Sequence, residues 1–143
     1  MTLKRAIEAA RELRDTEITD ETMTEWLNAH DENLWRRALQ FHGVAQPEQY
    51  VFPEEDEEET ENESSEDTAE DVVLMLPDRY AVELYPLFLC SRIDLAHGDY
   101  TRFNNNMLLY NDLLQRMLND YTRERAYQSA QSGGEHKPLA MMF

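Results

Sequence analysis

Residues that could carry chemistry are few and scattered in this chain of 143 residues. The chain has four histidines, His30, His42, His97 and His136. They do not form the close pairs that are typical of metal sites. The sequence contains no HExxH, no CxxC and no glycine-rich phosphate loop. Carboxylates such as Asp94 and Asp99 could support acid–base chemistry, but no pattern of a catalytic pocket accompanies them. We therefore expect no enzyme, no catalytic residue, no cofactor-binding residue and no metal ligand.

Cys90 is the only cysteine, so an intramolecular disulfide cannot form, which suits a reducing compartment. It falls on the apolar side of an expected helix, where a small buried hydrophobe is a commoner role than a nucleophile. The N-terminal stretch MTLKRAIEAARELR lacks the apolar core of a signal peptide, and the runs VVLML and PLFLC are too short to cross a bilayer. These features predict a soluble intracellular protein with no membrane contact.

The formal net charge of −17 is concentrated in one segment. Residues 54–71 carry 12 acidic residues and no basic one, which leaves −5 for the rest of the chain. The segment has almost no apolar residues, so it cannot bury enough surface to offset its ordering entropy. It also lacks the glycine that a calcium loop requires. We expect a mobile linker or disordered surface loop over residues 44–71, while the scattered Lys and Arg residues argue against a nucleic-acid-binding stripe.

Apolar residues at helical spacing predict an all-α fold, a small bundle of about four helices. The N-terminal helical pair occupies residues 1–43. Thr2 is the expected N-cap of the first helix, which ends around Asp15. Thr19 is the expected N-cap of the second, and Gly43 is expected to end that helix in the left-handed conformation.

The C-terminal helical pair is expected over residues 72–128, packed with the first pair into one domain. The run VVLML is either a strand or an extended segment lying across the helices. Asp78 is the expected N-cap of the third helix, which ends at Gly98. Pro86 lies inside this pattern, and a proline removes a helical hydrogen bond, so we expect a kink or restart near Glu83 to Tyr85.

The last helix raises the question of why HGDYTRFNNNM contains three consecutive asparagines, which together cost about 2 kcal/mol against alanine. A start at Asn104 would use that residue as the cap. A start at Gly98 or Asp99 instead produces an unbroken apolar seam at spacings of three and four, comprising Tyr100, Phe103, Met107, Tyr110, Leu114, Met117 and Tyr121. We prefer the earlier start, which places the asparagines inside the helix, beside the seam.

Interface roles explain these side chains better than catalysis. A bundle of about 100 ordered residues buries only about 60–65% of its surface, so some of the aromatic residues and methionines must face a partner or remain partly exposed. Asn104 and Asn111 share one flank, where a structural or interface hydrogen bond is expected, whereas Asn105 fits surface solvation equally well. The candidate interface residues are Tyr100, Phe103, Asn104, Asn105, Asn106, Tyr110 and Asn111.

Past Arg125 the apolar seam fades, and residues 129–143 are expected to form a flexible tail. Its last five residues, LAMMF, fit either a disordered terminus or a docking peptide at the end of a flexible linker.

The stretch LPDRYAVELYPLFLCSRIDLAHGDYTRFNNNMLLYNDLLQRMLNDYTRER resembles small all-helical head–tail connector (adaptor) proteins of tailed phages and prophages of Gram-positive bacteria. The N-terminal KRAIEAARELR and the EWL at Glu25 to Leu27 look alike as well. Departures from the pattern are His30 at an expected aliphatic position, Pro86 and Asn106. The matching positions are Pro77, Tyr80, Ile93 to Ala96, Gly98, Asp99, Tyr100, Arg102, Phe103, Asn104, Asn105, Met107, Tyr110 and Asn111.

The resemblance implies structural work in the virion. Such proteins form a homo-oligomeric ring beneath the portal protein and offer a docking surface to tail-completion or stopper proteins. They are all-helical, without cofactor or catalytic centre, and DNA passes nearby without specific binding. The chain would then be assembled in the bacterial host cytoplasm and reside at the head–tail junction of the virion.

An acidic DNA-mimic inhibitor, or a phage-encoded regulator of a nucleic-acid-binding protein, is the alternative that the net charge suggests. Mimicry needs carboxylates held at phosphate-like spacing, and here they lie mainly in a segment expected to be disordered. The connector is therefore the preferred hypothesis.

Overall fold

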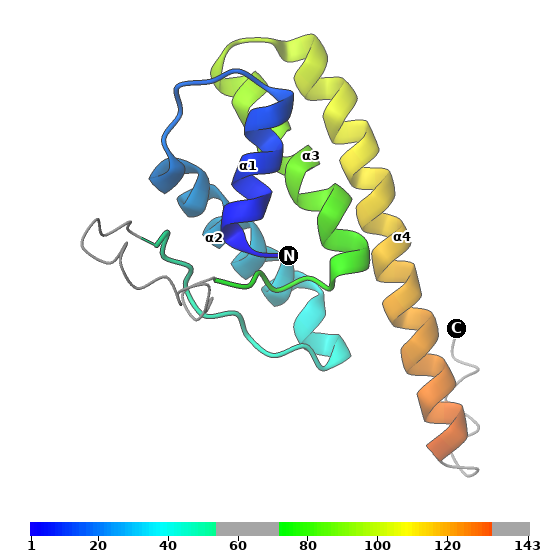
Figure 1. The fold of residues 1–143 in the computed structure, drawn as a ribbon. Helices are drawn as coiled ribbons and strands as arrows, with labels where there is room; N and C mark the ends of the chain where they lie inside the picture. The colour runs from blue at the N-terminus through cyan, green and yellow to red at the C-terminus, as the bar shows by residue number, and fades with distance from the viewer. Residues whose placement is uncertain (54–71, 133–143) are drawn as a thin grey trace.

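The computed structural model describes residues 1–53 and 72–132, and this part of the chain forms four α-helices and no strand (Figure 1). The predicted all-α bundle of about four helices is confirmed. The mobile linker predicted over residues 44–71 is wrong for residues 44–53, where Tyr50 is 6% exposed and its backbone is hydrogen-bonded to Asn28. Residues 54–71 lie between the second and third helices, and the disorder predicted for them and the flexibility predicted for residues 133–143 fall outside the described residues. The elements are α1 (Leu3–Leu13), α2 (Asp20–Arg37), the 3₁₀ helix η1 (Leu39–His42), α3 (Asp78–Ala96) and α4 (Tyr100–Ser132).

Threonine caps begin the first two helices, as the sequence predicts. The Thr2 hydroxyl accepts a hydrogen bond from the Arg5 backbone N–H, and the Thr19 hydroxyl accepts one from the Thr22 N–H, each at 3.1 Å. Each satisfies one of the free donors of a helix N-terminus. The end of the second helix differs from expectation, because α2 stops at Arg37 and the left-handed Gly43 (φ 83°) ends η1 instead.

Helix α3 corrects two predictions. Pro77, not Asp78, precedes its first turn, and the Asp78 carboxylate instead binds the N-terminal ammonium of Met1. Of the kink or restart expected near Glu83 to Tyr85, the restart is wrong, because α3 runs unbroken from Asp78 to Ala96, and the kink stays a prediction. Pro86 is buried, and the two residues before it, Leu84 and Tyr85, are fully buried. Packing on both sides of the proline therefore outweighs the roughly 3 kcal/mol by which it disfavours a helix interior.

The run VVLML lies extended across the helices and pairs with the N-terminus. The Leu3 N–H donates to the Val72 carbonyl at 2.7 Å, and the Leu74 N–H donates to the Met1 carbonyl at 2.9 Å. A single antiparallel bridge between Thr2 and Val73 joins the two segments. Of the two alternatives that the sequence leaves open, the extended segment is the observed one.

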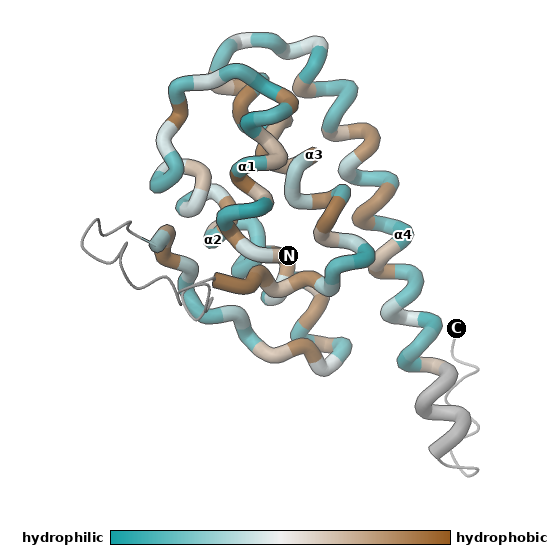
Figure 2. Tube along the Cα trace, in the orientation of Figure 1, coloured by the Kyte–Doolittle hydropathy of each residue, from teal (hydrophilic) through white to brown (hydrophobic). Residues whose placement is uncertain are grey.

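Helix α4 begins early, as predicted, with the Asp99 carboxylate accepting from the Arg102 N–H at 3.1 Å. It packs mainly on α3, and Figure 2 shows hydrophobic residues alternating with hydrophilic ones along it. The buried seam starts later than predicted, because Tyr100 in the first turn is 63% exposed. The helix also continues to Ser132, beyond the expected boundary at residue 128, and its C-terminal end projects past the rest of the bundle (Figure 1).

Candidate functional site

Five polar side chains meet inside the bundle around one carboxylate. The Asp31 Oδ2 atom accepts hydrogen bonds from the Tyr50 hydroxyl at 2.5 Å and the Tyr85 hydroxyl at 2.7 Å. Its Oδ1 atom lies 2.8 Å from His30 Nδ1, and His30 Nε2 lies 2.6 Å from the Tyr110 hydroxyl. We call these residues the Asp31 cluster. They join α2, the segment after η1, α3 and α4.

The Asp31 cluster is a structural network with its polar atoms satisfied. The Tyr50 and Tyr85 hydroxyls also accept from the backbone N–H groups of Met75 and Leu76. Burial, reinforced by the charge of Asp31, raises the pKa of Tyr50, Tyr85 and Tyr110, so these hydroxyls remain donors. Asp31 itself is 1% exposed. Such a carboxylate holds the fold together and has no free oxygen turned to a substrate.

A hollow of about 520 Å³ lies over this region, between α2 and residues 46–50. Part of its polar lining is used in hydrogen bonds that hold the fold, since the Asn28 side chain accepts from the Tyr50 N–H and donates to the Tyr50 carbonyl. Acidic side chains make up much of its remaining lining, among them Glu25, Glu32 and Glu48. These features do not form a catalytic arrangement.

A second buried carboxylate, Asp94, fixes the end of α1 against α3 and α4. Arg14 Nε lies 2.8 Å from Asp94 Oδ1, and Asn106 Nδ2 donates to Asp94 Oδ2 at 2.9 Å. Hydrogen bonding to Asp94 raises the pKa of Arg14. Asp94 is 3% exposed and therefore acts as a structural anchor, not as an acid–base group.

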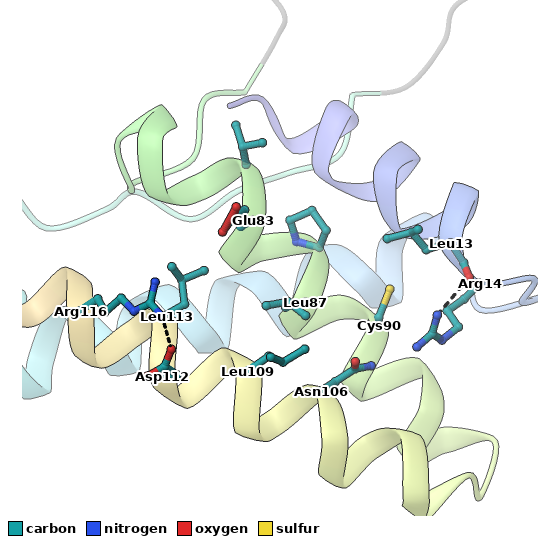
Figure 3. A pocket seen from close by; sticks show the side chains of 12 residues that line it. Leu13, Arg14, Glu83, Leu87, Cys90, Asn106, Leu109, Asp112, Leu113 and Arg116 are labelled. Atoms are coloured by element: carbon teal, nitrogen blue, oxygen red, sulfur yellow. Dashed lines mark hydrogen bonds and ion pairs between the residues drawn. The ribbon is translucent and has the colours of Figure 1, made fainter.

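An apolar groove of about 460 Å³ is bordered by α1, α3 and α4 (Figure 3), and we call it the α3–α4 groove. Leu13, Val82 and Leu109 are 57–60% exposed, which is unusual for large apolar side chains. Cys90 also lines the groove but is 2% exposed, and burial raises the pKa of its thiol, as expected for a packing residue. The complete lining is Leu13, Arg14, Val82, Glu83, Pro86, Leu87, Cys90, Asn106, Leu109, Asp112, Leu113 and Arg116.

A second exposed surface follows α4 at spacings of four, four and three residues. We call it the α4 stripe, and it comprises Tyr100, Asn104, Leu108 and Asn111. Tyr100 is 63% and Leu108 70% exposed. Neither Asn104 nor Asn111 makes a side-chain hydrogen bond within residues 1–53 and 72–126, where side chains are described. The hydrogen bond within the subunit that was one expectation for Asn104 and Asn111 is therefore not found in these residues. The other expectation, a hydrogen bond across an interface, stays a prediction.

The remaining predicted interface residues are distributed between surface and interior. Asn105 is exposed and Phe103 is half-buried. Asn106 belongs to the Asp94 anchor, and Tyr110 belongs to the Asp31 cluster. The seven candidates thus do not form one site.

Sequence reasoning missed the Asp31 cluster and the groove. One signal for the cluster was present, because His30 stands on the apolar face of α2 where an aliphatic residue is expected. A buried histidine needs polar partners, and Asp31 is its neighbour. The groove had no such signal, since Leu13, Val82 and Leu109 come from three different helices.

The chain matches no protein-family model, no curated protein and no solved structure. Among the helices that the structure describes, none is long and apolar enough to cross a membrane. No group of three or more His, Cys, Asp or Glu side chains gathers as a metal site in the described residues.

Proposed function

We propose that this chain is a head–tail connector (adaptor) subunit of a tailed phage or prophage. In this role it assembles as a homo-oligomeric ring beneath the portal protein and joins the DNA-filled head to the tail. The observation that carries the proposal is the presence, on one small bundle, of two separate surfaces that expose large apolar side chains. They are the α3–α4 groove and the α4 stripe.

Two unlike surfaces are what a ring subunit needs. A ring is built from heterologous contacts, in which one patch of each subunit meets a different patch of the next. Leu108 belongs to the α4 stripe and Leu109 to the groove, and consecutive residues of an α-helix point about 100° apart. The two surfaces therefore lie on different sides of α4 and can be occupied at the same time.

The resemblance to connector proteins supports the same function. Its most specific positions surround the turn from α3 to α4, where Gly98 adopts a φ of 77° and Asp99 caps the next helix. Three of the matching positions, Tyr100, Asn104 and Asn111, lie on the exposed α4 stripe. We assign this stripe to contact with a ring neighbour, the portal protein, or a tail-completion or stopper protein.

A test is to purify particles of the source phage or induced prophage and quantify the protein by mass spectrometry. We expect it in the particle at a copy number near that of the portal protein and far below that of the shell protein. An early stop codon in its gene should yield filled heads that do not join tails. Absence from mature particles would overturn the proposal and make the acidic DNA-mimic inhibitor the leading function.

A further inference from the structure

We propose that the α3–α4 groove binds the C-terminal segment of a second copy of this chain, residues 138–143, PLAMMF. This inference rests on the proposed function and deepens it, because it assigns one of the two surfaces through which ring subunits touch.

The groove has the size and chemistry of a peptide site. Its volume of about 460 Å³ falls within the roughly 300–1,000 Å³ range of pockets that hold small ligands, so it accommodates a few side chains and not a whole helix. Exposed apolar side chains form its walls, with Pro86 and Leu87 also in the lining (Figure 3). Covering Leu13, Val82 and Leu109 would remove this exposed apolar surface from water.

The C-terminal segment has the matching chemistry. It follows the polar stretch GGEHK and ends the chain with leucine, alanine, two methionines and phenylalanine. Methionine is unbranched and flexible, and therefore fills irregular apolar gaps. Lys137 directly precedes the segment, and Glu83 in the groove lining makes no ion pair with any other described residue. The charges of the two sides are thus complementary.

The length of the chain favours a neighbouring copy over the same copy. From Leu109 to Ser132 the helix covers 23 residues, which is about 35 Å. Met141 lies nine residues beyond Ser132 and reaches at most about 32 Å when fully extended. Return of residues 138–143 to their own groove would therefore require an almost fully extended chain from Ser132 onward, a constraint that a neighbouring copy does not impose.

The direction of α4 points to the same conclusion. Its C-terminal end projects past the other helices (Figure 1), and Ser132 lies about 35 Å along the helix from Leu109 in the groove. A contact in which the C-terminal segment of one copy enters the groove of the next is heterologous, and such contacts close into rings when the rotation permits. This assignment leaves the α4 stripe free for other partners.

The first experiment measures binding of a fluorescently labelled peptide of residues 133–143 to the full chain by fluorescence anisotropy. We expect saturable binding that Leu109→Asp weakens about ten-fold or more, because a charge replaces a buried leucine contact. Leu108→Asp is the matched control, since it places the same charge one residue away on the α4 stripe, and it should leave the affinity unchanged. Both leucines are largely exposed, and the thermal midpoint of each variant verifies that the bundle is folded. Absence of binding, or equal weakening by both variants, would overturn the proposal.

The second experiment distinguishes the neighbour from the same copy. A photo-crosslinking amino acid replaces Phe143 in chains of natural isotope content, which are mixed with heavy-isotope chains and illuminated. We expect light-to-heavy cross-links from position 143 to peptides containing Leu13, Val82 or Leu109. Cross-links found only within light chains, or cross-links to peptides that do not line the groove, would overturn the proposal.

The experiments distinguish a failure of the groove assignment from a failure of the connector function. If the protein is present in particles but the peptide does not bind, the groove assignment is wrong and the connector function stands. If the peptide binds with the expected specificity but the protein is absent from particles, the groove is a self-assembly contact and the connector function is wrong.

Discussion

Asp31 is the residue on which the buried hydrogen bonds of the bundle converge. It lies in the polar stretch HDENL of α2, which in sequence looks like a solvated helix face. Its partners Tyr50 and Tyr85 are 19 and 54 residues away, so only the folded chain brings them together. At the residue scale, the stability of this molecule depends on a carboxylate whose one local signal is the neighbouring His30 on the apolar face of α2.

Asp31→Asn should lower the free energy of unfolding by about 2–4 kcal/mol. The substitution removes the charge that two tyrosine hydroxyls donate to, and hydrogen bonds to charged groups are worth roughly 1.5–3 kcal/mol each. Urea unfolding followed by circular dichroism measures the change. Glu32→Gln, the same type of change at the exposed neighbouring residue, should alter stability by less than about 0.5 kcal/mol. A loss below about 1 kcal/mol in the Asp31 variant would mean that the carboxylate charge is not required.

We expect the tyrosines of the Asp31 cluster to lower the free energy of unfolding at alkaline pH. Burial, and secondly the charge of Asp31, raise the pKa of Tyr50, Tyr85 and Tyr110 above the usual value near 10. Above about pH 10 the unfolded chain releases these protons and the folded chain retains them. The free energy of unfolding should therefore fall by about 1.4 kcal/mol per pH unit for each such tyrosine. This contribution to stability is fully present below pH 10.

Urea titrations at several alkaline pH values measure this slope. The Tyr85→Phe variant should show a slope shallower by about 1.4 kcal/mol per pH unit, because it lacks one of the retained protons. An unchanged slope would show that Tyr85 does not hold its proton in the folded protein.

At the element scale, α4 divides its asparagines between two roles. Asn106 donates to the buried Asp94 and ties α4 to α3 and α1. Asn104 and Asn111 are exposed on the α4 stripe and contribute no side-chain hydrogen bond to the described part of the bundle. Their helix-propensity cost is therefore not offset by a side-chain bond within the described residues of one subunit, which suggests a contact outside them.

The double variant Asn104→Ala/Asn111→Ala should raise the free energy of unfolding of the monomer by about 1.3 kcal/mol, from helix propensity alone. Asn106→Ala has about half of this propensity gain and loses a bond to a carboxylate, so its stability should fall by about 1–2 kcal/mol. Urea unfolding compares them, with Asn105→Ala as the exposed single-site control. The double variant should also assemble poorly into particles. Normal assembly would show that these asparagines make no essential contact.

The starts of α1, α2 and α4 could be predicted because their causes are local, whereas the cap expected at Asp78 was wrong for α3. Thr2 and Thr19 act on backbone N–H groups three residues away, and Asp99 acts likewise at the start of α4. Pro86 could not be judged in this way, since the burial that keeps α3 continuous through it comes from other helices. The groove could not be predicted for the same reason, because its lining residues come from three helices, α1, α3 and α4. Element positions were thus readable from sequence, whereas the surfaces they form together were not.

At the scale of the whole molecule, charge and fold are separate. The helices pack around an apolar core with two buried carboxylates, Asp31 and Asp94, each satisfied by named partners. Of the formal charge of −17, residues 54–71 contribute 12 negative charges. A connector function uses the packed helices and their apolar surfaces, whereas a DNA mimic would depend on the acidic segment.

Replacing residues 54–71 with a Gly/Ser-rich segment of equal length discriminates between these functions. Because loop-closure entropy depends on length, the free energy of unfolding should change by less than about 1 kcal/mol. The neutral variant should restore tail joining in a phage that carries the early stop codon, as measured by infectious titre and by electron microscopy of particles. The matched control is a variant carrying Leu109→Asp with the acidic segment intact, which should fold but fail to restore joining. If instead the neutral variant folds and fails while the Leu109 variant succeeds, the acidic segment and not the α3–α4 groove is required for tail joining.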